Sequence, residues 1–186
     1  MPDVHTVRIR FADSSDAPAI AALHAESWRR HYRGAYSDAF LDGDVATDRQ
    51  AVWTRQLSNP PASHCTLVAE NGDALVGFAH TVLDDDPTWG ALLDNLHVVF
   101  ALKRNRIGSN LLAATARTVA ARTPESGLYL WVLEQNTPAQ AFYEARGAKR
   151  VGRQLVSPPG DVPSRLSGAP SAFRYVWPDP SALLIA

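Results

Sequence analysis

The chain has 186 residues, of which 46% are hydrophobic and 20% are charged, and its formal net charge is −1. This length and composition are typical of one globular domain with a sizeable core, and the charge lacks the basic surplus that binds nucleic acid or an anionic membrane. No apolar stretch approaches the roughly 18 residues of a membrane span. A single cysteine permits no internal disulfide, and no leader pattern follows Met1, so we expect a cytoplasmic protein.

The first half of the chain predicts one strand, two helices and a hairpin. Alternating residues indicate strands, and apolar residues at three- and four-residue steps indicate helices. Asn71-Gly72-Asp73 between two apolar runs favours a tight hairpin turn. The expected elements are a strand at 7–11, a helix between Asp16 and Gly34, a helix at 47–57, hairpin strands at 66–70 and 74–83, and a loop at 84–87.

The second half predicts a strand–helix–strand unit followed by a further helix and two strands. Thr137 is the expected N-cap of the last helix, with Pro138 at its first position and Gly147 after its end. The expected elements are strands at 92–99, 128–133, 149–156 and 173–177, helices at 107–122 and 137–146, and a loop rich in Pro, Gly and Ser at 157–170.

The segment from Asn136 to Gly147 carries the most specific motif. Its spacing, Asn-x-x-Ala-x-x-Phe-Tyr-x-x-x-Gly after a buried strand, resembles the second conserved block of the Gcn5-related N-acetyltransferase (GNAT) family. The resemblance implies that Asn136 holds the pantetheine arm of acetyl-CoA, with Ala139 and Phe142 in the same block. It also implies that Tyr143 lies near the sulfur as a candidate general acid. The competing interpretation is an ordinary core helix.

A second block upstream resembles the principal CoA-binding block of that family, a strand followed by a loop and a helix start. Backbone N–H groups at such a helix N-terminus form an anion hole that suits a pyrophosphate. Arg104 and Arg106 stand where the family commonly has Gly, and Phe100 replaces the usual Pro; a solvated basic turn is the alternative. The implied CoA-binding residues are Leu96, His97 and Val98 on the strand and Lys103, Arg104, Asn105, Arg106, Ile107, Gly108 and Ser109 in the loop and helix.

The element order and the resemblance together predict a mixed α/β fold. The resemblance implies a mostly antiparallel sheet of about seven strands flanked by about four helices, in one domain over residues 1–186 with a core at about 7–177. It also implies a β-bulge that separates the strand at 92–99 from the strand at 128–133. The acetyl thioester would lie in the resulting V-shaped gap.

The proton acceptor of the reaction is the weakest part of the pattern. The family often uses a Glu on the central strand, and Leu92 stands at that position. Asp94 is the nearest carboxylate, on the face of Leu96 by simple alternation, and is the expected base. Weaker candidates are His97, His80 and Glu134.

The acceptor side of the family lies at the first helix. Trp28, His31 and Tyr32 are therefore expected to face either the core or the substrate, and Arg174-Tyr175 lies on the last strand, which borders the same side.

No cluster of His, Cys and carboxylate residues has the spacing of metal ligands, and we expect no metal. The resemblance implies an N-acetyltransferase that moves acetyl from acetyl-CoA to a primary amine of a small molecule or peptide. The alternative is a non-catalytic acyl-CoA-binding or sensor module. The expected partners are this amine and, as an open option, a second copy of the chain in a homodimer.

Overall fold

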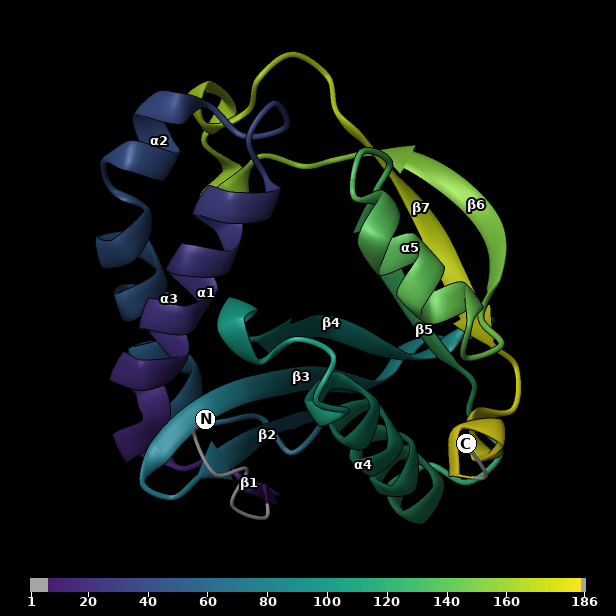
Figure 1. Ribbon diagram of the computed structural model, residues 1–186. Coiled ribbons are helices and arrows are strands. Elements are labelled where there is room, and N and C mark those ends of the chain that lie inside the picture. Colours follow the sequence, from purple (N-terminus) through teal and green to yellow (C-terminus); the bar gives the residue numbers. More distant parts are fainter. Residues whose placement is uncertain (1–6, 185–186) are drawn as a thin grey trace.

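The computed structural model describes residues 7–184, and seven strands in this range form one mixed sheet (Figure 1). The strand order is β1-β2-β3-β4-β5-β7-β6, and every neighbouring pair is antiparallel except β4 and β5, which are parallel. The expected fold is confirmed. The strands are β1 (Arg8–Phe11), β2 (His64–Asn71), β3 (Ala74–Asp86), β4 (Gly90–Val98), β5 (Leu128–Leu133), β6 (Lys149–Leu155) and β7 (Ser171–Trp177).

Helices cover both faces of this sheet. The apolar sides of α1 (Ala17–His31) and α3 (Val45–Ser58) pack on one face, where Ile20 and Trp53 meet Phe78 of β3. Ile107, Leu111 and Leu112 of α4 (Ile107–Arg122) pack on the other face, which α5 (Thr137–Glu144) also covers (Figure 1).

Two details of the predicted elements are wrong. A short helix, α2 (Asp38–Asp42), was not predicted; its five residues are too few for a periodic pattern, and it forms because Phe40 and Leu41 are buried. The expected loop at 84–87 is partly strand, since β3 continues to Asp86 and pairs there with Gly90.

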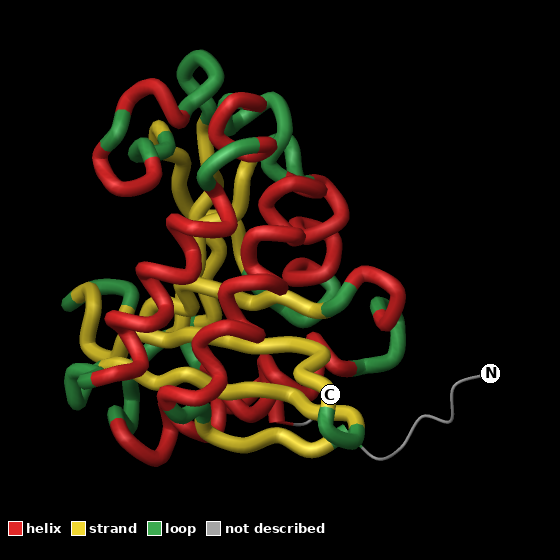
Figure 2. The backbone as a smooth tube through the Cα atoms, turned by 90° about the vertical axis from the view of Figure 1, so that its left-hand side faces the viewer, coloured by secondary structure: helices red, strands yellow, loops and turns green. Residues whose placement is uncertain are grey.

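A β-bulge in β4 divides the sheet. The antiparallel register of β3 and β4 changes from His80↔Asn95 to Thr81↔Leu93, which leaves Asp94 as the extra residue of β4. Parallel pairing of β4 with β5 is limited to Ala91↔Leu128 and Leu92↔Tyr129. Beyond these pairs the strands diverge, and Figure 2 shows the two groups of strands at a steep angle to each other. We call the unpaired region between residues 93–98 and 130–133 the strand gap.

The loop between β6 and β7 closes over the end of α1. Tyr36 forms a β-bridge with Leu166, and the Ser37 N–H donates to the Arg165 carbonyl at 2.8 Å. The Arg165 guanidinium also donates to the Asp48 carboxylate of α3 at 2.7 Å. The Pro-rich segment is a loop, as predicted, and these bonds fix it across the top of the molecule in Figure 1.

Candidate active site

The loop before α4 adopts a backbone conformation that ordinarily requires glycine. Arg104 and Arg106 have φ angles of 71° and 60°, in the left-handed region, and Arg106 is the N-cap of α4. Side chains there crowd the following carbonyl, at a cost of about 1–2 kcal/mol per residue. The loop therefore keeps the path that glycine would give it, although both positions carry arginine.

This path leaves a set of backbone donors without acceptors. Within residues 7–184 no protein group accepts from the N–H of the following five residues: Arg104, Arg106, Ile107, Gly108 and Ser109. The α4 dipole adds positive potential at the same point. Free N–H groups at a helix N-terminus can bind an oxyanion such as a phosphate, so the loop has the geometry that its expected role requires.

The end of α1 adds cationic side chains to this loop. Lys103 donates to His31 Nε2 at 2.9 Å, and the Arg30 guanidinium lies 4.1 Å from the Phe100 ring centroid. Partial burial, followed by the charge of Arg30, lowers the pKa of Lys103, and burial followed by the charge of Lys103 lowers that of His31. An anion placed here would relieve this repulsion. The structure thus places His31 beside the loop before α4.

Arg106→Gly tests the conformation of this loop. Glycine should raise the free energy of unfolding by about 1 kcal/mol, because it adopts φ near 60° without steric strain. Affinity for CoA should nevertheless fall by about tenfold, because the exposed Arg106 is available for a charge-assisted bond to phosphate. Urea unfolding and calorimetric titration with CoA measure the two effects.

The control is Arg117→Gln, which removes one positive charge from the exposed side of α4. An unchanged CoA affinity in Arg106→Gly would contradict the expected bond between Arg106 and phosphate.

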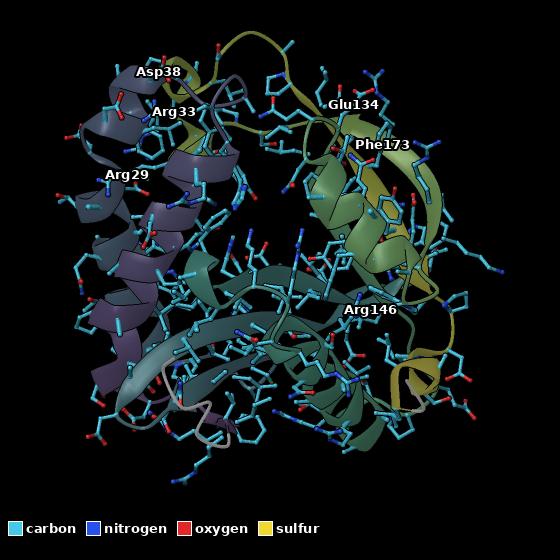
Figure 3. The ribbon with its side chains drawn as sticks, in the orientation of Figure 1. Arg29, Arg33, Asp38, Glu134, Arg146 and Phe173 are labelled. Carbon is cyan, nitrogen blue, oxygen red and sulfur yellow. The ribbon has the colours of Figure 1, made fainter. Side chains whose placement is uncertain are left out.

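Arg146 joins α4 to α5 on the other side of the loop. Its guanidinium lies 3.7 Å from the Phe142 ring centroid and donates to Ser109 Oγ, with Nε at 3.2 Å. Figure 3 labels Arg146 near α4 and α5. Phe142 in turn packs against Gly108, where an added Cβ would lie 3.4 Å from the ring. Sequence reasoning missed Arg146, which lies in the turn after α5; its position four residues after Phe142, at the end of the expected helix, was the available signal.

Asn136 caps α5, which corrects the expected N-cap at Thr137. Its side-chain Oδ1 accepts from the Ala139 N–H at 3.3 Å. The amide nitrogen of Asn136 has no acceptor among residues 7–184 and can therefore donate to a ligand between β4 and β5. The opposite edge, from Leu96 to Val98 of β4, has no β5 partner, so its backbone groups are free to pair with an extended ligand.

Tyr143 reaches the strand gap from α5. Only 8% of the residue is exposed, and none of residues 7–184 forms a hydrogen bond with its hydroxyl. Burial, followed by the proximity of Tyr32, raises the pKa of Tyr143. The phenol therefore keeps its proton at neutral pH and is available as a donor.

Asp94 faces α1 from the bulge. Its side chain is solvent-exposed. Desolvation by the surrounding protein nevertheless raises the pKa of Asp94, and the hydrogen bond from Asn95 and the charge of Arg49 lower it by smaller amounts. The pKa of Tyr32 is raised to about 12, first by burial and then by the negative charge of Asp94. Leu96 instead packs with the α4 core, so Asp94 and Leu96 lie on opposite faces. The expectation of a shared face was wrong because the bulge interrupts the alternation.

The weaker candidate bases are engaged elsewhere. Burial lowers the pKa of His97 to about 3, and the ring shares a hydrogen bond with Ser27 at 2.7 Å. His80 is buried between Thr66 and Gln56, and burial lowers its pKa to about 4. Glu134 is ion-paired with Arg153 at 2.8 Å.

The residues of α1 that were expected to face either the core or the substrate lie in different surroundings. Trp28 is only 8% exposed and belongs to the core with Tyr36, beneath the Arg49 guanidinium at 4.2 Å. Tyr32 stacks on Trp28 with ring centroids 5.5 Å apart and remains half-buried beside Asp94. Of the three, Tyr32 is the one placed at the strand gap.

A surface pocket of about 390 Å³ lies at the rim beyond the end of β5. Its walls are Gly34 after α1, residues 133–135, and the end of the β6–β7 loop. Of the candidate catalytic residues it includes only Glu134, which is ion-paired with Arg153, so the pocket lies apart from Asp94 and Tyr143.

Over residues 7–184, no group of three or more His, Cys, Asp or Glu side chains is arranged to hold a metal ion. No helix in the same range is long and apolar enough to cross a bilayer.

Comparison with known proteins agrees with this geometry. Residues 24–148 match the family model described as the acetyltransferase (GNAT) family. A probable N-acetyltransferase of Mycobacterium tuberculosis is 27% identical over 156 residues, which are 82% of this chain and 86% of the relative. An uncharacterized N-acetyltransferase of Bacillus subtilis, YuaI, is 27% identical over 95% of this chain and 96% of the relative.

Solved structures share the fold. The PaiA N-acetyltransferase of Thermoplasma acidophilum, in complex with coenzyme A, superimposes with a TM-score of 0.71 at 18% identity, over 92% of this chain and 99% of that chain. NAA60 of Arabidopsis thaliana, in complex with a bisubstrate analogue, gives 0.67 at 16% identity over 92% and 97% of the two chains. The family match covers more than half of the sequence, and the anion-binding loop, the divergent strands and the fold agree with it. The chain is an N-acetyltransferase of the GNAT family.

Proposed function

We propose that the protein acetylates a primary amine of a small molecule or peptide, and that the amine attacks the thioester of acetyl-CoA directly. The observation that carries this proposal is the bulge at Asp94. It ends the pairing of β4 with β5 and sets a carboxylate on the strand gap. The charge of Asp94 raises the pKa of Tyr32, and the proximity of Tyr32 raises the pKa of Tyr143, which supports a site where Tyr32 lies near both residues.

The chain's own groups would hold the acetyl donor at its two ends. The unbonded N–H groups before and within the first turn of α4 receive the pyrophosphate, and Lys103 adds positive charge. The free edge of β4 and the Asn136 amide receive the pantetheine arm. Acetyl-CoA supplies the acetyl group as an activated thioester.

Proton movement then falls to two residues. An alkylamine with a pKa of about 10.4 is mostly protonated at neutral pH, and only the neutral form, which has released that proton to solvent, attacks the thioester carbonyl. Asp94 accepts the second proton, which the nitrogen loses as the C–N bond forms. When the C–S bond breaks, the electron pair leaves with the CoA sulfur. The Tyr143 hydroxyl donates a hydrogen bond to this sulfur as negative charge develops on it.

Release of the CoA thiol with a panel of primary amines tests the proposal. The kcat/KM of the wild-type protein should fall as the pH is lowered through the pKa of Asp94, because only the carboxylate accepts a proton. Asp94→Asn should remove this acidic limb and lower turnover. If thiol release requires no amine, or if the limb survives with the same midpoint in Asp94→Asn, the assignment of the base is wrong.

A further inference from the structure

Arg174 on β7 is held by aromatic rings instead of by an acid. Its guanidinium carbon lies 4.5 Å from the centroid of Trp131, 5.0 Å from that of Trp89 and 5.6 Å from that of Tyr129. Cation–π contacts of this kind use the faces of the rings and satisfy no N–H donor. The rings therefore fix the guanidinium and leave its hydrogen bonds unmade.

The donors of Arg174 have no protein acceptor. Among residues 7–184 its guanidinium makes no hydrogen bond and no ion pair within 4.0 Å, and its Nε atom is buried without a partner. A buried donor without an acceptor costs free energy that a ligand can recover. The fork of a guanidinium matches a carboxylate through two parallel hydrogen bonds. Arg174 thus has the properties of a carboxylate receptor.

Arg174 lies on the same face of the sheet as Asp94. It pairs in register with Trp131 of β5, and Leu133, two residues along, packs with Trp28 and Tyr36 of the α1 side. Leu130 and Val132, on either side of Trp131 in the sequence, belong to the α4 side. Asp94 also faces α1, as its effect on Tyr32 indicates.

The two groups flank the strand gap. Asp94 is on β4 and Arg174 is two strands away on β7. Two paired strand spacings measure roughly 10 Å, and β4 and β5 diverge here, so the two backbones are at least this far apart. Trp131, half-buried, lies between them on β5. Both ends of an extended acceptor can be held across this distance.

We propose that the acceptor is a primary amine bearing a carboxylate several bonds from its nitrogen, and that Arg174 binds this carboxylate. The inference rests on the proposed transfer to an amine beside Asp94. The ammonium end approaches the Asp94 carboxylate, the methylene chain crosses Trp131, and the carboxylate meets the guanidinium. A diamine would place its second cation against Arg174 and is disfavoured by repulsion.

Matched acceptors test this specificity. The ω-amino carboxylates γ-aminobutyrate and ε-aminocaproate should be acetylated with a kcat/KM at least about tenfold above that of their amides, butylamine and putrescine, because only they engage Arg174. Equal rates for the carboxylates and their amides would overturn the inference.

The variant Arg174→Gln tests the proposed contact with the carboxylate directly. It should lower kcat/KM for γ-aminobutyrate by about ten- to a hundredfold, mainly through KM, while the value for the amide changes less than about threefold. Arg150→Gln is the control and should change neither, because Arg150 is exposed on neighbouring β6 and its guanidinium likewise lies over an aromatic ring, 4.6 Å from the centroid of Phe173. If Arg174 only stabilises the rings, Arg174→Gln will lower the melting temperature and affect the two acceptors alike, which refutes the inference.

A binding measurement separates this inference from the proposed function. Binding of γ-aminobutyrate to the CoA-loaded protein should change tryptophan fluorescence, and Arg174→Gln should abolish the change. Such binding without thiol release would refute acetyl transfer to this amine and retain the carboxylate site. Thiol release from amines of every kind without a carboxylate preference would retain the transfer and refute the site. The absence of both binding and turnover with ω-amino carboxylates would also refute the site, and thiol release with the other amines would then decide the transfer separately.

Discussion

Replacing Tyr143 with phenylalanine is expected to lower kcat by about ten- to a thousandfold while affinity for acetyl-CoA barely changes. The substitution keeps the buried ring that packs with Phe142 and Trp177 and removes only a hydroxyl without a protein partner in residues 7–184. The hydroxyl is expected to form its hydrogen bond with the departing sulfur in the transition state and not in the ground-state complex, so its loss should lower kcat rather than affinity. Stopped-flow release of the CoA thiol and calorimetry measure the two quantities.

Tyr175→Phe is the matched control for this variant. Tyr175 is also buried in the α4-side core, but its hydroxyl donates to Glu144 at 2.6 Å on the outer side of α5. Loss of this hydroxyl should lower stability by about 1 kcal/mol and leave kcat within about twofold. If Tyr143→Phe also keeps the wild-type kcat, Tyr143 has no part in the reaction, and solvent protonates the thiolate, which is a tolerable leaving group with a pKa of about 8.5.

The sequence predicts the architecture well because its elements are long and strongly patterned. The apolar run at 128–133 and the Asn136-to-Gly147 motif place β5 and α5 almost without error. α2 was missed because a five-residue helix depends on tertiary burial of Phe40 and Leu41 rather than on periodicity. The N-cap at Asn136 was missed because Thr137 and Asn136 are both good capping residues, and only the backbone decides between them.

The site is less readable from the sequence, because its geometry depends on backbone irregularities. The bulge turns Asp94 away from Leu96, and no residue type in β4 marks its position. The positive φ angles of Arg104 and Arg106 contradict their residue preferences and are imposed by the strand before them and the helix after them. The surroundings of Arg174 bring together β3–β4, β5 and β7, and such contacts between distant segments have no local signal.

The histidines beneath α1 lead to the second large expected effect, which concerns stability. Trp53 donates to His24 Nδ1 at 2.9 Å, and His24 lies 4.7 Å from His97 between ring centroids. Burial lowers the pKa of His24 well below its ordinary value, and it lowers the pKa values of His80 and His97 to about 4 and about 3. All three rings are therefore neutral in the folded protein at neutral pH.

Lowering the pH from about 6.5 to about 4.5 should therefore destabilise the fold by several kcal/mol. Below about pH 6.5 the unfolded chain binds protons on these histidines and the folded chain does not, so the free energy of unfolding falls as the pH falls. For the fully buried His80, a pKa lowered from 6.5 to about 4 corresponds to a loss of about 3 kcal/mol once the pH reaches 4. Urea unfolding at a series of pH values measures this slope.

Two carboxylates also change the free energy of unfolding as the pH is lowered, but neither accounts for a loss between pH 6.5 and 4.5. Asp16, whose pKa is lowered by its hydrogen bond from Arg10, loses stabilising charge only below about pH 4. Asp94, whose pKa is raised, acts in the opposite direction and offsets part of the loss.

His80→Gln should unfold more easily at pH 7 but lose less stability on acidification, by up to about 1.4 kcal/mol per pH unit, because it binds one proton fewer on unfolding. A wild-type free energy of unfolding that stays level from pH 6.5 to 4.5 would mean that the folded protein accepts these protons, and that the buried rings are solvated when they do.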